Sequence, residues 1–254
     1  DTSIALHENS GEVYPHISFY DVTNMDLRYA EWTNGATWAV QTIDSDVTDD
    51  IGSQSALALD TVTNDAFVSY IVNGNELRVI NQTTGTWGSF ATVDPLGSSW
   101  SDIAWNSGSS RGNPVVSYID TGGNLRFAYF LSSWSTEVVD SAGNGGTNTA
   151  VVIDGSGNIH IVYADTTLNV IKYAVYTGTW SVTPTNLGNG TDPISGVSLD
   201  VDGSGIPHIS FVLLNSLVYA YRDGTDWMLE TVVAGNVAAA TSTSLVLNGA
   251  GSPF

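Results

Sequence analysis

Carboxylate side chains give this sequence most of its capacity for chemistry. The 254 residues contain 26 Asp and Glu against 6 Lys and Arg, a formal net charge of −20. Asp200 and Asp202 precede a Gly-x-Gly turn, and carboxylates at this spacing resemble half of a calcium-binding loop. The bidentate Glu that completes such a loop is missing. Two interpretations stay open, a calcium site at Asp200 and Asp202 or a tight turn, and no other cofactor is expected.

Three of the four histidines occupy one position of an internal repeat, namely His16, His160 and His208. Equivalent positions in a repeat lie far apart, so these side chains cannot share one metal ion. A catalytic histidine needs an acid or a nucleophile within hydrogen-bond reach, and the spacing supplies none. We therefore expect packed, hydrogen-bonded histidines between neighbouring repeats.

Composition excludes several classes of function. Nucleic acids and anionic membrane surfaces require many Lys and Arg to neutralise phosphate, and this chain has only 6. No apolar run reaches the roughly 18 residues that a membrane-spanning helix needs. The absence of cysteine removes disulfides, thiolate nucleophiles and Cys-based zinc sites. The negative charge suits a cation, a basic partner or a high-salt environment.

Two patterns recur along the whole chain. One is a tryptophan, spaced by 49, 47, 46 and 47 residues, at Trp38, Trp87, Trp134, Trp180 and Trp227. The other is a short β-rich run such as His16–Phe19, repeated at 67–70, 115–118, 160–163 and 208–211. Two markers with the same period identify a repeat protein.

Each repeat is predicted to form four strands, A to D, separated by Gly, Asn and Asp turns. Four-stranded units of about 47 residues match the blades of a β-propeller. The predicted fold is an all-β, five-bladed β-propeller of four-stranded antiparallel blades, in one domain. Its repeats are 1–54, 55–100, 101–147, 148–194 and 195–242, with a surplus strand at 243–254. Six or more blades are expected if the chain is a fragment. The recurrent tryptophan is expected to pack between blades, or else to form a sugar-stacking platform.

The repeat also resembles a known family. Its motifs are Pro15–Asp21, Leu27–Ala30 and Gly85–Trp87, and they look like those of secreted prokaryotic proteins with tandem propeller blades. Five blades of this length are similar in architecture to tachylectin-type lectins. The resemblance implies the fold and secretion, so the predicted location is extracellular or at the cell surface. It implies no particular ligand.

Acidic residues concentrate on one predicted face of the propeller, where the B–C and D–A loops lie. Aspartate caps tight turns, which accounts for many of them. Capping explains less well the crowding in the first D–A loop. The predicted ligand-binding residues are therefore Asp44, Asp46, Asp49, Asp50 and Asp94.

Short loops and similar repeats favour a binding or adhesion module, which recognises a glycan or a protein through one loop face. An alternative is a structural block of a larger extracellular assembly, in contact with other chains. A further alternative is a five-bladed glycosidase, which requires two carboxylates near the central axis. The predicted inner strands carry almost no acids, so no enzyme activity is expected. The charge balance and the lack of a long apolar run predict no nucleic-acid partner and no membrane insertion.

Overall fold

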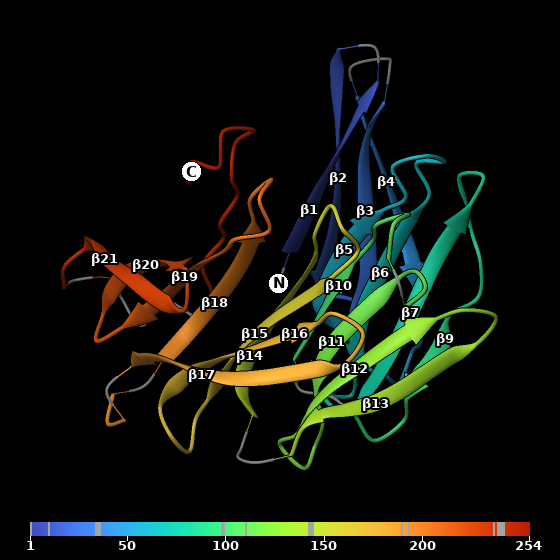
Figure 1. The fold of residues 1–254 in the computed structure, drawn as a ribbon. Coiled ribbons are helices and arrows are strands. Elements are labelled where there is room, and N and C mark those ends of the chain that lie inside the picture. The colour runs from blue at the N-terminus through green and yellow to red at the C-terminus, as the bar shows by residue number, and fades with distance from the viewer. Residues whose placement is uncertain are drawn as a thin grey trace. The chain divides into compact units, whose positions relative to one another are not determined.

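The structure of the chain is a computed structural model. It describes residues 2–9, 11–33, 37–97, 100–109, 111–141, 145–188, 190–192, 194–235, 237 and 242–254. Within these ranges the regular structure consists of β-strands, with no α-helix (Figure 1). No helix in these ranges is therefore long and apolar enough to cross a membrane. The chain divides into two compact units: unit 1 contains residues 1–107, 111–121 and 128–136, and unit 2 contains 108–110, 122–127 and 137–254.

The strands form five antiparallel sheets, numbered here in chain order. Sheet 1 consists of β1 (Thr2–Asn9), β2 (Glu12–Asp21), β3 (Asp26–Thr33) and β4 (Thr37–Asp44). Sheet 2 consists of β5 (Ile51–Leu59), β6 (Ala66–Val72), β7 (Glu76–Thr83), β8 (Thr86–Trp87) and β9 (Ala91–Asp94). In sheet 2 both β8 and β9 pair with β7, so the fourth strand is split in two.

The other three sheets have four strands each, in sequential order. Sheet 3 consists of β10 (Trp100–Ala104), β11 (Val115–Ile119), β12 (Leu125–Phe130) and β13 (Trp134–Asp140). Sheet 4 consists of β14 (Gly145–Ile153), β15 (Ile159–Asp165), β16 (Val170–Tyr176) and β17 (Trp180–Gly188). Sheet 5 consists of β18 (Ile194–Val201), β19 (Pro207–Leu213), β20 (Ser216–Asp223) and β21 (Asp226–Val233). The successive strands of each sheet are called A to D below.

Strand A starts earlier than the sequence pattern indicates. In sheet 2 it begins at Ile51 rather than at Ser55, and its register is irregular near its start. Gly52 adopts φ +107°, and a Cβ at this position would lie 2.8 Å from the Leu27 backbone. Only glycine tolerates that conformation and that approach. The β14 and β18 strands carry similar register shifts, which break the alternation by which a strand is recognised.

Burial is greatest in strand B. All seven residues of β15 and all five of β11 are buried. A strand exposed on one face would alternate between buried and exposed side chains. Sheets 3 and 4 are therefore covered on both faces in their middle strands, as expected when a small sheet can bury its apolar faces only by stacking on its neighbours.

The recurrent tryptophan of strand D packs on an aromatic ring of strand C in the preceding sheet. Trp87 meets Tyr29 edge-on at 4.9 Å between ring centroids, and Trp227 meets Tyr173 in the same way at 5.7 Å. In unit 2, Trp180 lies 5.1 Å from Phe127. Edge-to-face pairs at these distances add to the stabilisation that burial provides. The packing role predicted for this tryptophan is confirmed at these three positions.

The first prediction tests this packing. Trp180→Ala should lower the free energy of unfolding by about 3 kcal/mol, the lower end of the usual cost of removing a large aromatic side chain, because Trp180 is partly buried. Urea denaturation measures the difference. Trp38→Ala is the matched control, because Trp38 occupies the same repeat position but is 44% exposed, and it should cost less than half as much. Equal losses in both variants would contradict the inter-sheet role.

Candidate functional site

Two of the predicted ligand-binding residues, Asp44 and Asp94, accept hydrogen bonds from buried tyrosines. Tyr70 donates to Asp44 at 2.5 Å, and Tyr118 donates to Asp94 at 2.9 Å. Both tyrosines are fully buried. Arg78 also lies 3.5 Å from Asp44. These bonds join strand D of one sheet to the next sheet, so both carboxylates hold consecutive sheets together.

The same arrangement in sheet 4 contains the only lysine of the sequence. Asp140 accepts a short hydrogen bond from Tyr163 and lies 2.9 Å from the ammonium of Lys172. Lys172 also lies 2.8 Å from Asp165, which is 1% exposed. Burial alone would lower the pKa of Lys172, but the two carboxylates outweigh it and raise this pKa above its ordinary value. Lys172 is therefore a charged, buried link between sheets 3 and 4.

Removing this ammonium should be costly. Lys172→Met leaves Asp140 and Asp165 without their counter-charge, and breaking a buried ion pair typically costs about 3–5 kcal/mol. We expect a loss of that size at pH 7 in urea denaturation. A second substitution, Asp165→Asn in the Lys172→Met background, should recover much of the loss because it removes the stranded charge. If Lys172→Met alone were as stable as the original protein, Lys172 would not be a stabilising link between the sheets.

The remaining predicted ligand-binding residues are bonded locally within the D–A loop. Asp46 accepts from the backbone N–H and the hydroxyl of Thr48, at 2.9 and 2.8 Å. Asp49 accepts from the side-chain amide of Asn73 at 2.9 Å. A hydrogen bond to Asp50, together with burial, raises the pKa of Tyr20 to about 12. Each of these acids has a structural partner, and their role in ligand binding stays a prediction.

Both aspartates of the predicted calcium site are also hydrogen-bonded within the chain. Asp202 accepts from the backbone N–H groups of Ser204 and Ile206, at 2.8 and 2.9 Å. Asp200 accepts from the backbone N–H of Leu247 at 2.8 Å. Among the described residues no group of three or more His, Cys, Asp or Glu side chains is placed to hold a metal ion. The tight-turn interpretation accounts for the contacts of Asp202, Asp200 instead links strand A of sheet 5 to the C-terminal residues, and calcium binding stays a prediction.

The three repeated histidines are buried, and each pairs with a tyrosine of strand C in its own sheet. The Tyr173 hydroxyl lies 2.6 Å from Nδ1 of His160, and the Tyr219 hydroxyl lies 2.5 Å from Nδ1 of His208. His16 makes the same contact, a short hydrogen bond with Tyr29. The expected hydrogen bond exists, but its partner lies within the sheet rather than between sheets.

His160 also contacts an acid through its second ring nitrogen, a contact that the spacing of the sequence did not predict. Nε2 of His160 lies 3.2 Å from Oδ2 of Asp154. Asp154 is held by backbone N–H groups of its own turn, from Ser156 and Asn158, both at 2.8 Å. Burial would raise the pKa of Asp154, but these hydrogen bonds outweigh it and keep the pKa below its ordinary value. The carboxylate is therefore ionised, and it accepts the Nε2–H of a neutral imidazole.

This pairing fixes the direction of a hydrogen-bond chain formed by Tyr173, His160 and Asp154. With the proton on Nε2, Nδ1 of His160 accepts from the Tyr173 hydroxyl. The guanidinium of Arg222 lies over the Tyr173 ring at 5.7 Å. Burial raises the pKa of Tyr173 to about 12, and the positive charge of Arg222 opposes that rise. The donors thus run from Tyr173 through His160 to Asp154, and Arg222 faces the ring at the start of this chain.

A polar cavity of about 560 Å³ opens beside this chain, between sheets 4 and 5. Asp154, His160, Tyr173 and Arg222 line it, together with the A–B turn of sheet 5 at 203–205. Nε of Arg222 is buried and has no hydrogen-bond partner among the described residues. The cavity therefore presents a positively charged donor, hydroxyl groups and an aromatic ring to a ligand.

A second cavity occupies the equivalent place between sheets 1 and 2. It has a volume of about 350 Å³, and its lining includes His16, Glu31 and Trp32. The A–B turn of sheet 2 contributes Asn64. No aspartate corresponds to Asp154 here, and Nε2 of His16 has no partner among the described residues. The two cavities share a location in the repeat but not a full set of side chains.

Both cavities lie at the A–B and C–D turns, at the opposite end of the strands from the predicted ligand-binding acids Asp44, Asp46, Asp49, Asp50 and Asp94, although Asp202 of the predicted calcium site precedes the turn at 203–205. A signal for the Asp154–His160 pair was nevertheless present. The pattern Asp-Gly-Ser-Gly followed by a histidine six residues after the aspartate occurs at 154–160 and again at 202–208. In the second copy, Nε2 of His208 lies 3.8 Å from Asp202.

Burial of His16 leads to a pH prediction. Burial, together with the nearby His7, lowers the pKa of His16 to about 4, whereas an unfolded histidine titrates near 6.5. The folded state therefore binds this proton more weakly than the unfolded state does. The contribution of His16 to stability is complete above about pH 6.5 and is lost as pH falls toward 4.

Urea denaturation between pH 7 and 4 measures this effect. His16→Asn should reduce the slope of unfolding free energy against pH by up to about 1.4 kcal/mol per unit in that window. The lower absolute stability of the variant does not affect this comparison, because only the slope is compared. Identical slopes in the two proteins would show that His16 is not held neutral.

Comparisons with known proteins give structural similarity without sequence similarity. No family model matches the chain, and no curated protein matches it. The proposed kinship with secreted prokaryotic repeat proteins therefore has no support from these searches.

Solved structures do match. AofleA of Arthrobotrys oligospora gives a TM-score of 0.64 at 13% identity, over 99% of this chain and 76% of that one. The Aleuria aurantia lectin, solved with α-methyl-L-fucoside, gives 0.62 at 15% identity, over 92% and 78%. A Hadza microbial sialidase, Hz136, gives 0.58 at 13% identity, over 95% and 60%. At such identities the similarity shows the fold alone, which is that of a β-propeller; the Aleuria lectin is described as six-bladed.

Proposed function

We propose that this protein is a glycan-binding module and that the cavity between sheets 4 and 5 is a saccharide site. The observation that carries the proposal is the hydrogen-bond chain from Tyr173 to Asp154, with Arg222 over the Tyr173 ring, beside a polar cavity of about 560 Å³. Because each internal donor of the chain already has an acceptor, the groups at the cavity wall are held in fixed orientations. Fixed polar groups next to an aromatic ring suit a ligand rich in hydroxyl groups.

The comparisons support the same class of ligand. The Aleuria lectin is described as fucose-specific, and its structures include α-methyl-L-fucoside and a fucosyl disaccharide. Another structural neighbour, the lectin SapL1, is also solved with α-methyl fucoside. We therefore propose fucosylated glycans as the first ligands to test.

Binding without catalysis is the more economical proposal. A glycosidase needs two carboxyl groups on opposite sides of the scissile bond, whereas Asp154 is the single carboxylate among the described residues that line this cavity. That carboxylate is already engaged by His160 and by its turn. The Tyr173 hydroxyl, with a pKa of about 12, is a poor nucleophile at neutral pH. We accordingly propose a lectin-like protein that acts outside the cell.

Binding of fucosylated glycans, measured on an array and then by calorimetry, tests the proposal. Arg222→Ala removes the free donor, and loss of a charged hydrogen bond should weaken binding by about 10- to 100-fold. Arg28→Ala is the matched control, because Arg28 also lies in strand C but pairs with Asp21 near the B–C turn. The control should bind like the original protein.

Other outcomes are equally informative. Binding that survives Arg222→Ala but fails after Asp46, Asp49 and Asp50 are changed together to Asn would place the site in the acidic D–A loop instead. The proposed function would be refuted by two results together. The original protein would bind no glycan on the array, and the Arg222→Ala variant would have the same melting temperature as the original protein.

A further inference from the structure

The C-terminal residues 243–254 make the same contacts with sheet 5 that strand A of one sheet makes with the sheet before it. Ser198 in strand A of sheet 5 accepts from the backbone N–H of Leu245 at 3.0 Å. Between sheets 1 and 2, Ser3 accepts from the backbone N–H of Leu57 at 3.1 Å. Ser3 and Ser198 hold the same place in the repeat, since both pair with the buried serine of strand B. Residues 243–247 therefore occupy the position of a strand A on the face of sheet 5.

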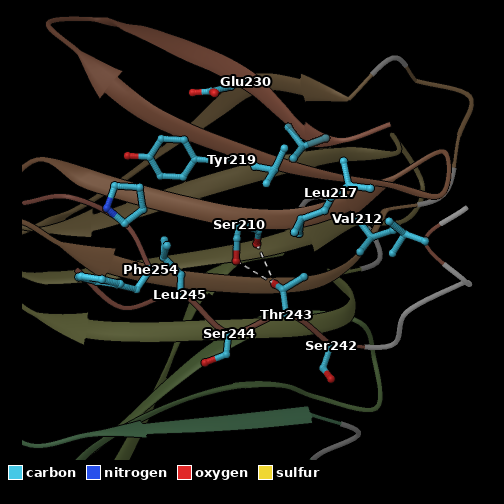
Figure 2. Close-up of a pocket in the computed structure, with 15 residues that line it drawn as sticks. Ser210, Val212, Leu217, Tyr219, Glu230, Ser242, Thr243, Ser244, Leu245 and Phe254 are labelled. Atoms are coloured by element: carbon cyan, nitrogen blue, oxygen red, sulfur yellow. Dashed lines mark hydrogen bonds between the residues drawn. The ribbon is translucent and has the colours of Figure 1, made fainter. Parts of the chain in front are cut away.

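Serine contacts repeat in the same way. Ser18 in strand B of sheet 1 lies 3.2 Å from Ser55 in strand A of sheet 2. Ser210 in strand B of sheet 5 donates to Thr243 at 3.0 Å, the hydrogen bond drawn in Figure 2. Thr243 thus replaces the serine of an ordinary strand A.

The turn that follows is also that of the repeat. Asn248 accepts from the backbone N–H groups of Ala250 and Ser252, both at 2.9 Å, as Asp202 does in the A–B turn of sheet 5. Leu247 forms an isolated bridge with Pro253. Val201 pairs with Pro207 at the equivalent place in sheet 5. Residues 243–254 therefore correspond in position to a strand A, an A–B turn and the first two residues of a strand B, although only the Leu247–Pro253 bridge is formed.

An apolar cavity of about 530 Å³ lies between this segment and strands B to D of sheet 5 (Figure 2). Its wall includes Val212, Leu217, Tyr219, Val232, Leu245 and Phe254. Val232 and Phe254 are 55% and 79% exposed. Exposed apolar surface of this kind marks an interaction site.

Two side chains in this cavity form a socket for an indole, namely Tyr219 and Glu230. In unit 2 the indole of Trp180 packs edge-on against Phe127, and its Nε1–H donates to Glu137 at 2.7 Å. Tyr219 corresponds to Phe127, because both occupy the same position of strand C. Glu230 corresponds to Glu137, because each follows the recurrent tryptophan by three residues.

The Tyr219–Glu230 socket thus offers an aromatic edge partner and a carboxylate at matched positions. Both side chains line the cavity, and both are labelled in Figure 2. The contacts of Trp180 with Phe127 and Glu137 show that an indole fits between such a pair of side chains. An indole entering from strand D of a following sheet would meet both groups at once.

We propose that this cavity is a docking surface for a three-stranded β-meander of the same repeat, consisting of strands B to D, whose strand D places a tryptophan in the Tyr219–Glu230 socket. Continuity with the interfaces already described identifies the occupant. A complete four-stranded sheet does not fit, because residues 243–247 already fill the strand A position. Sheet 1 of a second copy would bring its own strand A, β1, to the same place.

Completing the sheet tests the proposal. The chain is extended after Phe254 with a copy of residues 209–235, which continues strand B in register and supplies strands C and D. In a second extension, the copy of Trp227 is replaced by Ala. The tryptophan extension should melt roughly 6–12 °C higher than the alanine extension, as expected for one buried tryptophan in a protein of this size. Glu230→Gln should lower the midpoint of the extended protein and leave that of the unextended chain unchanged.

Amide exchange gives a second readout. The amides of Ser244 and Val246 should gain protection in the tryptophan extension, because strand B would accept their N–H groups, whereas the N–H of Leu245 already donates to Ser198. Equal midpoints for the two extensions, or a dimer of the unextended chain that buries the cavity, would overturn the proposal. If the extensions fail to fold, a peptide of residues 226–233 replaces them. Its binding to the unextended chain should weaken at least tenfold when Trp227 is replaced by Ala, and equal binding by both peptides would refute the socket.

Discussion

Packing between consecutive sheets is the constraint on which the rest of this structure depends. A sheet of four short strands has two apolar faces and cannot cover either of them alone. Here one ring from strand D meets one ring from strand C of the preceding sheet, as in the Tyr29–Trp87 pair. Serine contacts such as Ser18–Ser55 fix the separation of the same two sheets. The two polar cavities form at the strand ends, where this packing gives way to turns.

The unusual acidity of the chain follows partly from the same interfaces. Tyrosines in strand B are too deeply buried to bond with water, so each needs an acceptor from the neighbouring sheet. Asp44 and Asp94 at the end of strand D provide it. A carboxylate accepts such bonds strongly when it is ionised. Many negative charges thus have a packing role, and acid content alone is weak evidence for a cationic ligand.

Periodicity made most of the fold predictable. Trp87, Trp180 and Trp227 recur at nearly constant spacing, and constant spacing in a repeat implies equivalent positions. The start of β5 was not predictable in this way, because the irregular register near Gly52 removes the alternation of buried and exposed side chains. The number of blades was also beyond reach, since one repeat looks the same in propellers of different size.

The candidate site was less predictable than the fold. Asp154 and His160 meet across a turn, so their approach depends on the path of the backbone and not on either residue type alone. Arg222 belongs to the following sheet, and only the stacking of sheets 4 and 5 brings it to Tyr173. Repetition of the Asp-to-His spacing at 202–208 was a usable clue. The metal-site interpretation of that segment used its carboxylates and did not include the histidine.

The placement of the few cationic residues has a consequence for proteolysis. Five of the six occupy strand C: Arg28, Arg78, Arg126, Lys172 and Arg222. Strand C is bonded to a neighbour on both sides, whereas a protease must draw its substrate into an extended, unpaired form. Arg111, between β10 and β11, is the exception. Trypsin should therefore find one accessible bond in the native protein, and cleavage elsewhere would report the opening of an individual sheet.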